Sequence, residues 1–276
     1  MVAPSIEGQF GENVNLASIR ATLKKIGFTD MVEVGLGADM TAAYESLEWI
    51  EAIKEGRKMT TSCCPAFTNM LKKHYPTVYE NNKSQTVSPM CATSRYLKVI
   101  HPDCLTVFIG PCVAKKDESQ NQGIEGNADY VMTYGELGIL MRSHKTEFEQ
   151  SSDFQQQASS FGKKFAGSGG VANAVIESMK ERGENTEGIV LQQCSGGAEC
   201  KKTIMQLKFG KLQADFVEGM FCPGGCVGGP SRRKTELEIT KARNRLLSEA
   251  DNRGILENLK NYPMNKFSMY VDNHKD

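Results

Sequence analysis

The sequence predicts an α/β fold in which short, mainly parallel strands are flanked by helices. Short apolar runs alternate with amphipathic stretches, an order typical of strands joined by crossover helices. The run at residues 105–110, Leu-Thr-Val-Phe-Ile-Gly, is apolar and β-branched, as expected of a buried central strand. At 276 residues the chain is long enough for one large domain or for two lobes.

Apolar spacing sets the predicted elements of the first half. Residues 2–5 fit a strand end or a loop. In the helix expected at residues 39–53, apolar side chains recur at roughly helical spacing and mark a buried face. Pro65 suits the first turn of the helix that follows it. The predicted helices are residues 15–28, 39–53, 66–74 and a stretch that follows Met90 and ends at Ile100, and the predicted strand among them is residues 31–36.

Strands and helices also alternate in the second half. The predicted strands are residues 128–133, 188–193 and 214–220, and the predicted helices are residues 135–143, 172–182, 197–207, 236–247 and 254–259. Residues 147–164 are polar, rich in Gln and Ser, and predict a surface excursion. The glycine-rich turn at residues 167–171 has neither a GxGxxG nor a GK[ST] motif, which favours tight packing near a cofactor over phosphate binding.

Composition excludes several classes of partner. Lys+Arg and Asp+Glu both number 33, so no broad basic surface is expected for nucleic acid or anionic lipid. No apolar run approaches the roughly 18 residues that a membrane helix needs, and the first residues lack the features of a signal peptide. Nine cysteines fit a reducing compartment and metal ligation better than a disulfide framework. We therefore expect a cytoplasmic protein that binds neither nucleic acid nor membrane.

Four cysteines are the candidate metal ligands. Cys222 and Cys226 are separated by three residues, two of them glycine, so both thiols can point at one soft metal centre. Cys64 and Cys112 come from separate loops, and four such thiolates are the usual complement of a cubane iron–sulfur cluster. Zinc also accepts four sulfurs, but its ligands usually come as close pairs, so the spacing favours a cluster. Of the remaining thiols, Cys91 and Cys104 are assigned to the core, and a structural or incidental role is assigned to Cys194 and Cys200.

Other polar residues leave two interpretations open. Cys63 precedes Cys64 at a helix start, where a thiolate is favoured, but the two could equally be buried small hydrophobes. Glu45 and Glu48 share one side of a predicted helix, and spacing alone favours a solvated flank. Beyond the 105–110 strand, Lys115 could hold an anionic ligand beside a thiolate-bound cluster, or its charged run could be a solvated turn.

Three segments carry a resemblance to a known family. They are Thr61-Ser62-Cys63-Cys64-Pro65, Pro111-Cys112-x-x-Lys115-x-x-Glu118 and Met220-x-Cys222-x-Gly224-Gly225-Cys226-x-x-Gly229. In that order they resemble the signature segments of the iron-only (FeFe) hydrogenases. The resemblance implies two lobes, each with a mainly parallel sheet flanked by helices, that close on the H-cluster. We expect a single catalytic domain over residues 1–276, with approximate lobes 1–126 and 127–260 and a C-terminal tail at 261–276.

The resemblance also assigns roles. In the family, a 4Fe–4S cubane is bridged through one cysteine to a two-iron unit that carries CO, cyanide and an azadithiolate. By position, the cubane ligands would be Cys64, Cys112, Cys222 and Cys226, with Cys226 as the bridge. Lys115 would hydrogen-bond a cyanide, and the other cofactor-binding residues would be Pro4, Ser5, Met220 and Glu118. Protons would pass from Cys63, which faces the bridgehead amine, through Glu45, Ser84 and Glu48 toward solvent.

Three departures from the family pattern separate this chain from its standard members. Gly110 stands where a methionine is usual, Met90 stands where a glutamine is usual, and the third segment ends in Gly228-Gly229-Pro230-Ser231. They resemble the drift of divergent or sensory members, so an H2 or redox sensor, or a hydrogenase-like iron–sulfur assembly protein, is the alternative to a hydrogenase. We expect electrons from a ferredoxin-like donor or a missing iron–sulfur domain, since no ferredoxin-like cysteine cluster precedes Val2. Maturation proteins would supply the two-iron unit.

Overall fold

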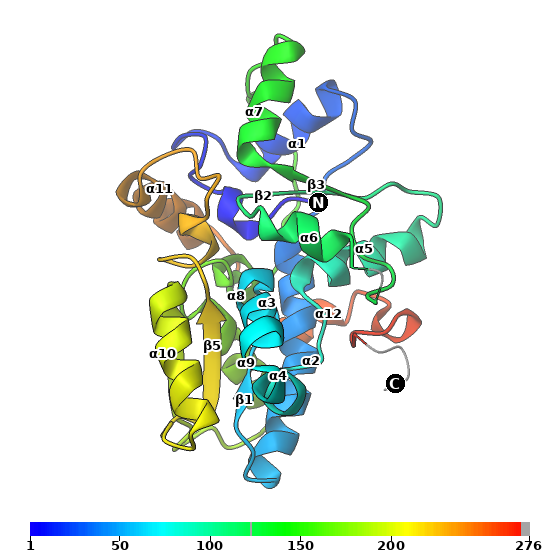
Figure 1. Cartoon of the computed structure of the whole chain (residues 1–276). Helices are drawn as coiled ribbons and strands as arrows, with labels where there is room; N and C mark the ends of the chain where they lie inside the picture. Colours follow the sequence, from blue (N-terminus) through cyan, green and yellow to red (C-terminus); the bar gives the residue numbers. More distant parts are fainter. Residues whose placement is uncertain (122, 272–276) are drawn as a thin grey trace.

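The computed structural model describes residues 1–121 and 123–271 as helices packed around two small parallel sheets (Figure 1). This confirms the predicted α/β class. The elements before residue 126 are η1 (Pro4–Ile6), α1 (Leu16–Lys25), α2 (Val34–Lys54), β1 (Met59–Thr60), α3 (Pro65–His74), α4 (Pro76–Asn82), α5 (Pro89–Ile100), β2 (Val107–Gly110) and α6 (Ala114–Ser119). Those after it are β3 (Tyr130–Thr133), α7 (Tyr134–Ser143), α8 (Ser160–Lys164), α9 (Gly170–Glu181), β4 (Leu191–Ser195), α10 (Gly197–Lys208), β5 (Phe216–Met220), η2 (Cys226–Gly228), α11 (Glu236–Ser248), α12 (Ile255–Leu259) and η3 (Met264–Lys266).

The sheets direct three loops toward one place. One sheet has the order β1-β5-β4, the other pairs β2 with β3, and every pair is parallel. Strand β1 is followed by Cys63 and Cys64, β2 by Cys112, and β5 by Cys222. Because ligands of parallel sheets gather beyond the carboxyl ends of the strands, this topology brings the cysteine loops together.

Helix α2 is the central element of the fold. It begins within residues 31–36, where the sequence predicts a strand, so that prediction is wrong. Figure 1 shows α2 running along the middle of the molecule, with β5 and α10 on one side and α12 on the other. The helix begins at Val34, and only Glu33 retains a bridge, to Val2. A Cβ on Gly37 would lie 2.3 Å from the Pro89 carbonyl oxygen, so α5 packs directly against the α2 backbone. A helix buried on most sides has a continuous apolar sequence, which explains the confusion with a buried strand.

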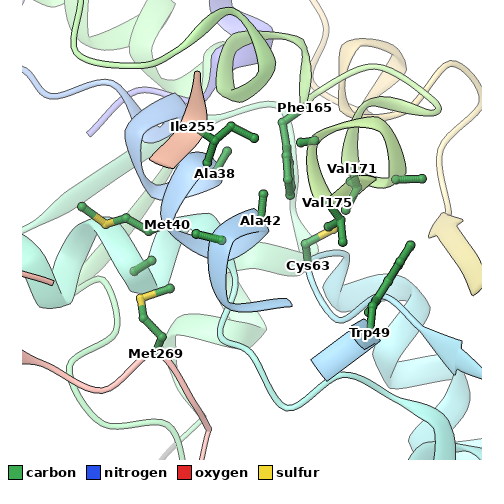
Figure 2. Close-up of a cluster of buried hydrophobic side chains, with 14 of the residues drawn as sticks. Ala38, Met40, Ala42, Trp49, Cys63, Phe165, Val171, Val175, Ile255 and Met269 are labelled. Carbon is green, nitrogen blue, oxygen red and sulfur yellow. The ribbon is translucent and has the colours of Figure 1, made fainter. Parts of the chain in front are cut away.

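The largest hydrophobic cluster packs α2 against α9 and the segment before it. Figure 2 shows Cys63, Phe165, Val171 and Val175 in this cluster together with Ala42 of α2. Trp49, on the same helix, stacks on Phe216 of β5 with ring centroids 3.8 Å apart. Cys63 therefore belongs to a dry, closely packed region.

The structure also differs from the predicted secondary structure and lobes in other regions. The surface excursion predicted at residues 147–164 is wrong at its end, where Ala158 and Ser159 are fully buried and α8 follows. The short elements β1 and α4 were not predicted. Each sheet draws strands from both sides of residue 126, so the sheets do not follow the predicted lobes, whose boundary stays a prediction. Residues 272–276 of the predicted tail lie outside the described residues.

Across residues 1–121 and 123–271, no helix is both long enough and apolar enough to cross a bilayer.

Candidate functional site

Five thiols line one cavity at the carboxyl ends of β1, β2 and β5. The cavity encloses about 770 Å³, part of it continuous with solvent, and its thiols belong to Cys63, Cys64, Cys112, Cys222 and Cys226. Lys115 is the one charged side chain among the lining residues, and most of the others are apolar or small. Four predicted ligands and the predicted proton-transfer thiol are thus brought together.

Local backbone chemistry holds these thiols in place. Cys64 occupies the N-cap of α3, with Pro65 as the first helical residue. In the third loop, Gly225 has φ 79° and ψ −155°, a conformation that is essentially restricted to glycine. Gly225 also bridges Gly167 in an antiparallel pair, so the glycine-rich turn before α9 clamps the loop just before Cys226. The predicted role of that turn, tight packing near the site, agrees with this geometry.

Burial and the neighbouring candidate ligands raise the pKa values of the thiols in the third loop. Burial raises the pKa of the Cys222 thiol to about 11, and the charges of Cys64 and Cys112 add to the effect. Burial and the other three ligand thiols likewise raise the pKa of Cys226. Four thiolates that share a largely apolar cavity need a positive charge at their centre, which a metal cluster provides.

The donor set fits a cubane better than a single ion. In the part of the chain that the structure describes, no three His, Cys, Asp or Glu side chains converge closely enough for one metal ion. A cubane does not need three side chains around one ion, because each cysteine binds a different iron. Four thiols around one cavity are the ligands that a cubane uses. Glycines at the Cys226 loop leave room for close backbone approach.

Lys115 is held by three acceptors in the cavity wall. Its Nζ donates to Glu118 Oε2 at 2.6 Å, to Ser88 Oγ at 2.8 Å and to the Cys63 carbonyl oxygen at 3.3 Å. Ser88 Oγ also donates to Glu118 Oε1. The solvated-turn interpretation of this charged run is therefore wrong for Lys115 and Glu118, which lie in a buried network. Ser88 was not among the predicted site residues, although Ser88-Pro89 resembles a lesser signature of the family.

The predicted proton path begins at Cys63. Burial raises the pKa of this thiol well above its usual value, and the charge of Glu45 adds to the effect. Glu45 is fully buried, and neither of its carboxylate oxygens has a partner with hydrogen-bond geometry in the described residues. Burial first, and then the charge of Glu48, raise the pKa of Glu45 to about 8, while the nearby Ser84 hydroxyl opposes the shift. The solvated-flank interpretation is wrong for Glu45.

Glu48 connects the path to a second cavity. Its carboxylate accepts from the Gln85 amide at 2.9 Å and from Thr86 Oγ1 at 3.2 Å, and the Thr86 amide donates to Ser84 Oγ at 3.1 Å. The second cavity, of about 920 Å³, is polar and has Glu48 in its wall. Of the four predicted path residues, Cys63 thus lines the thiol-lined cavity and Glu48 the polar one, and the charge of Glu45 acts on Cys63.

Pro4, Ser5 and Met220 line the first cavity as predicted. Ser5 Oγ lies 2.8 Å from the hydroxyl of Tyr134, a fully buried residue that no sequence motif indicated.

Two departures from the family pattern fall on the same wall. Met90 lines the cavity, and a Cβ on Gly110 would lie 2.5 Å from the Phe108 ring, which also lines it. The space of a side chain at position 110 is thus taken by Phe108.

Comparisons with known proteins agree with this geometry. The family described as "Iron only hydrogenase large subunit, C-terminal domain" matches residues 1–230. Iron hydrogenase 1 of Clostridium pasteurianum is 27% identical over an alignment of 307 positions, which covers 91% of this chain and 53% of that protein. The cytosolic Fe-S cluster assembly factor NAR1 of Kluyveromyces lactis is 23% identical over an alignment of 290 positions, which covers 80% of this chain and 56% of that protein.

The structural comparison concerns the fold alone. A variant of FeFe-hydrogenase HydA1 from Chlamydomonas reinhardtii superposes with a TM-score of 0.73 at 21% identity, covering 95% of this chain and 88% of that one. The chain spans about half the length of the first two curated relatives that it matches.

Proposed function

The chain belongs to the iron-only hydrogenase large-subunit family, and from this premise we propose that it activates H2 reversibly, 2H+ + 2e− ⇌ H2, at an H-cluster. One observation carries the proposal. Cys63 lines the cavity of the four candidate ligand thiols, the buried Glu45 acts electrostatically on Cys63, and Glu48 lines a second, polar cavity.

The four ligand cysteines would hold a cubane, with Cys226 as the bridge to a two-iron unit. When bound, that cluster supplies a Lewis-acidic iron and stores electrons. The apolar wall formed by residues such as Met220 and Pro4 limits water near it and strengthens electrostatic contacts inside. Lys115 is placed to orient an anionic ligand in the cavity, with Glu118 and Ser88 fixing its ammonium group.

Cys63 and Glu45 would move protons at atoms that are buried and neutral at rest. The raised pKa keeps a proton on Cys63 Sγ, at the cavity. With a pKa of about 8, Glu45 is mainly protonated at neutral pH, so it can receive a proton from one side only as it releases one to the other. Glu48, fixed by the Gln85 amide, then passes the proton to the outer cavity.

The test is H2 evolution from reduced methyl viologen after loading with iron, sulfide and a synthetic two-iron unit. Infrared bands of CO and cyanide verify loading. We expect Cys63→Ala to keep those bands and to lose nearly all turnover, because the first proton acceptor is gone. The matched control is Cys91→Ala, a buried thiol outside the cavity, which should keep turnover. Inactivity of correctly loaded protein, or full activity of Cys63→Ala, would contradict the proposal.

A sensor of H2 or of redox state is the second candidate, favoured by the cavity wall. Phe108 fills the side-chain space of position 110, and Met90 lines the same cavity. Both alter the surroundings of a bound cluster, which tune its potential and turnover. Turnover as fast as that of a dedicated hydrogenase would exclude this role.

An iron–sulfur assembly role is the third candidate, and the similarity to NAR1 is its support. Such a protein would carry cubanes alone. CO and cyanide bands in protein produced with maturation proteins would exclude it.

The proposal also includes partners and location. Electrons would come from a ferredoxin-like donor or from an iron–sulfur domain of a longer chain, and maturation proteins would deliver the two-iron unit. The cytoplasm, where thiols stay reduced, suits nine free cysteines.

A further inference from the structure

A second buried cation, Arg243 of α11, lies beside the Cys226 loop. Its Nη2 donates to the Lys163 carbonyl oxygen, and its Nη1 lies 4.0 Å from the position of a Cβ on Gly167. Gly167 is the bridge partner of Gly225, the residue before Cys226. Helix α11 also packs on the loop through Ile239, which shares a hydrophobic cluster with Val227 and Cys226. The guanidinium is thus held within electrostatic reach of Cys226.

The charge of Arg243 is permanent and weakly compensated. Arginine does not lose its proton in proteins. The Nε of Arg243 has no partner in the described residues, and the same is true of Oε2 of Glu7, an acid whose charge acts on Arg243. The other oxygen of Glu7 faces Lys163 at 3.6 Å, and Lys163 is itself paired with Glu33 at 3.0 Å. A buried charge without a close counter-ion is costly, so a nearby anion would stabilise it.

The buried cation in the cavity wall itself has a close counter-ion. Lys115 is neutralised by Glu118 at 2.6 Å, so much of its field is cancelled. A cubane with four thiolates is anionic, and each electron that it accepts adds a negative charge. A fixed positive charge in a dry region stabilises the reduced form more than the oxidised form, and net local charge is one of the factors that set cluster potentials.

We propose that Arg243 acts through space on the cubane at Cys226 and raises its reduction potential. This inference rests on the cubane assignment of the proposed function. It does not require the two-iron unit or any H2 chemistry. Arg243 lies beyond residue 230, where the match to the family ends.

The experiment uses the full chain loaded with iron and sulfide alone. The midpoint potential of the cubane is measured by redox titration followed by electron paramagnetic resonance. For Arg243→Gln, we expect the ratio of reduced to oxidised cubane at the wild-type midpoint to fall about tenfold, which is about 59 mV for one electron. Arg243→Met keeps an apolar stem for packing and should give the same shift if Arg243→Gln does not fold.

Two controls separate charge from structure. Arg243→Lys keeps the charge but loses the planar hydrogen-bonding group, so it should retain most of the wild-type potential. Arg245→Gln removes an exposed charge from the same helix and should leave the potential unchanged. Equal shifts in the Lys and Gln variants, or no shift in either neutral variant with an intact cubane, would overturn this inference alone. Failure of the wild-type protein to assemble any cubane would overturn the proposed function together with it.

Discussion

Oε2 of Glu118 lies 2.6 Å from Nζ of Lys115 in the wall of the thiol-lined cavity, and both side chains are 10% exposed. The three N–H donors of the Lys115 ammonium group are all used, one each by Glu118, Ser88 Oγ and the Cys63 carbonyl oxygen. Lys115 can therefore bind a ligand in the cavity only by releasing one acceptor. The contact with Cys63, at 3.3 Å, is the longest and the easiest to exchange.

The first prediction concerns this ion pair. Glu118→Gln should lower the free energy of unfolding of the metal-free protein by about 3–5 kcal/mol, because it leaves the buried ammonium without a counter-charge. Urea denaturation measures the change. Glu55→Gln is the control, since its exposed pair with Arg57 at 2.9 Å should contribute about 0–1 kcal/mol. A loss from Glu118→Gln as small as that of the control would show that the buried pair does not stabilise the fold.

The second prediction separates ligands from other thiols. Alanine at Cys64, Cys112, Cys222 or Cys226 should abolish the absorption and electron paramagnetic resonance signals of a cubane, since each cysteine would bind a different iron. Cys63→Ala should retain those signals, because we propose that Cys63, which lines the same cavity, transfers protons and is not a ligand. Cys194→Ala, a buried thiol outside the cavity, should also retain them. A full cubane signal in Cys112→Ala would remove that residue from the ligand set.

That the four candidate cysteines line one cavity could be expected from the sequence, because the signals are local. Cys112 and Cys222 closely follow predicted strands, and glycine and proline mark the turns at Cys64 and Cys226. Helices with one apolar face, such as the predicted 15–28 and 197–207, were likewise found close to their observed positions. Local sequence patterns predict secondary structure well where one hydrophobic periodicity dominates the segment.

The predictions failed where tertiary packing determines the structure. The start of α2 was assigned to a strand because a helix buried on most sides loses its apolar period. Phe108, Tyr134 and Arg243 reach the site from elements whose contacts depend on the folded arrangement, so no local pattern indicates them. The burial of Glu45 has the same cause, since its spacing from Glu48 is also that of an exposed acidic flank.

The third prediction concerns pH and Glu45. Its folded pKa of about 8 exceeds its ordinary value of 4.5, so between these values the folded state keeps a proton that the unfolded state has lost. The contribution of Glu45 to the free energy of unfolding is therefore greatest below about pH 4.5. It decreases as the pH rises and levels off above about pH 8. Glu45→Gln should make the free energy of unfolding depend less on pH in that window.

Other groups and a control complete this test. Burial also raises the pKa of Asp39 and Glu218 to about 7, so part of the slope should remain in Glu45→Gln. Glu51→Gln, an exposed position on the same helix, should keep the wild-type slope. Urea titrations across the window measure all three proteins. An identical slope in Glu45→Gln and wild type would mean that Glu45 is ionised across that range.

The fourth prediction concerns the backbone of the Cys226 loop. A Cβ on Gly225 would lie 2.8 Å from the Ala166 carbonyl oxygen and 2.8 Å from the Ser168 nitrogen, and φ is 79°. Gly225→Ala therefore combines a clash with backbone atoms and a disfavoured conformation, which alone costs about 1–3 kcal/mol. We expect lower stability and a lower content of cubane iron, because Cys226 must shift when the bridge to Gly167 opens.

Gly210 provides the matched control for this change. It also has a positive φ, of 66°, but no atom lies within 4 Å of its Cβ position. Gly210→Ala should cost about 1–2 kcal/mol and leave the iron content unchanged, because its strain is far from any ligand loop. Iron analysis and thermal denaturation of the two variants distinguish general strain from loss of the clamp. If Gly225→Ala bound as much iron as Gly210→Ala, the contact with Gly167 would not be what positions Cys226.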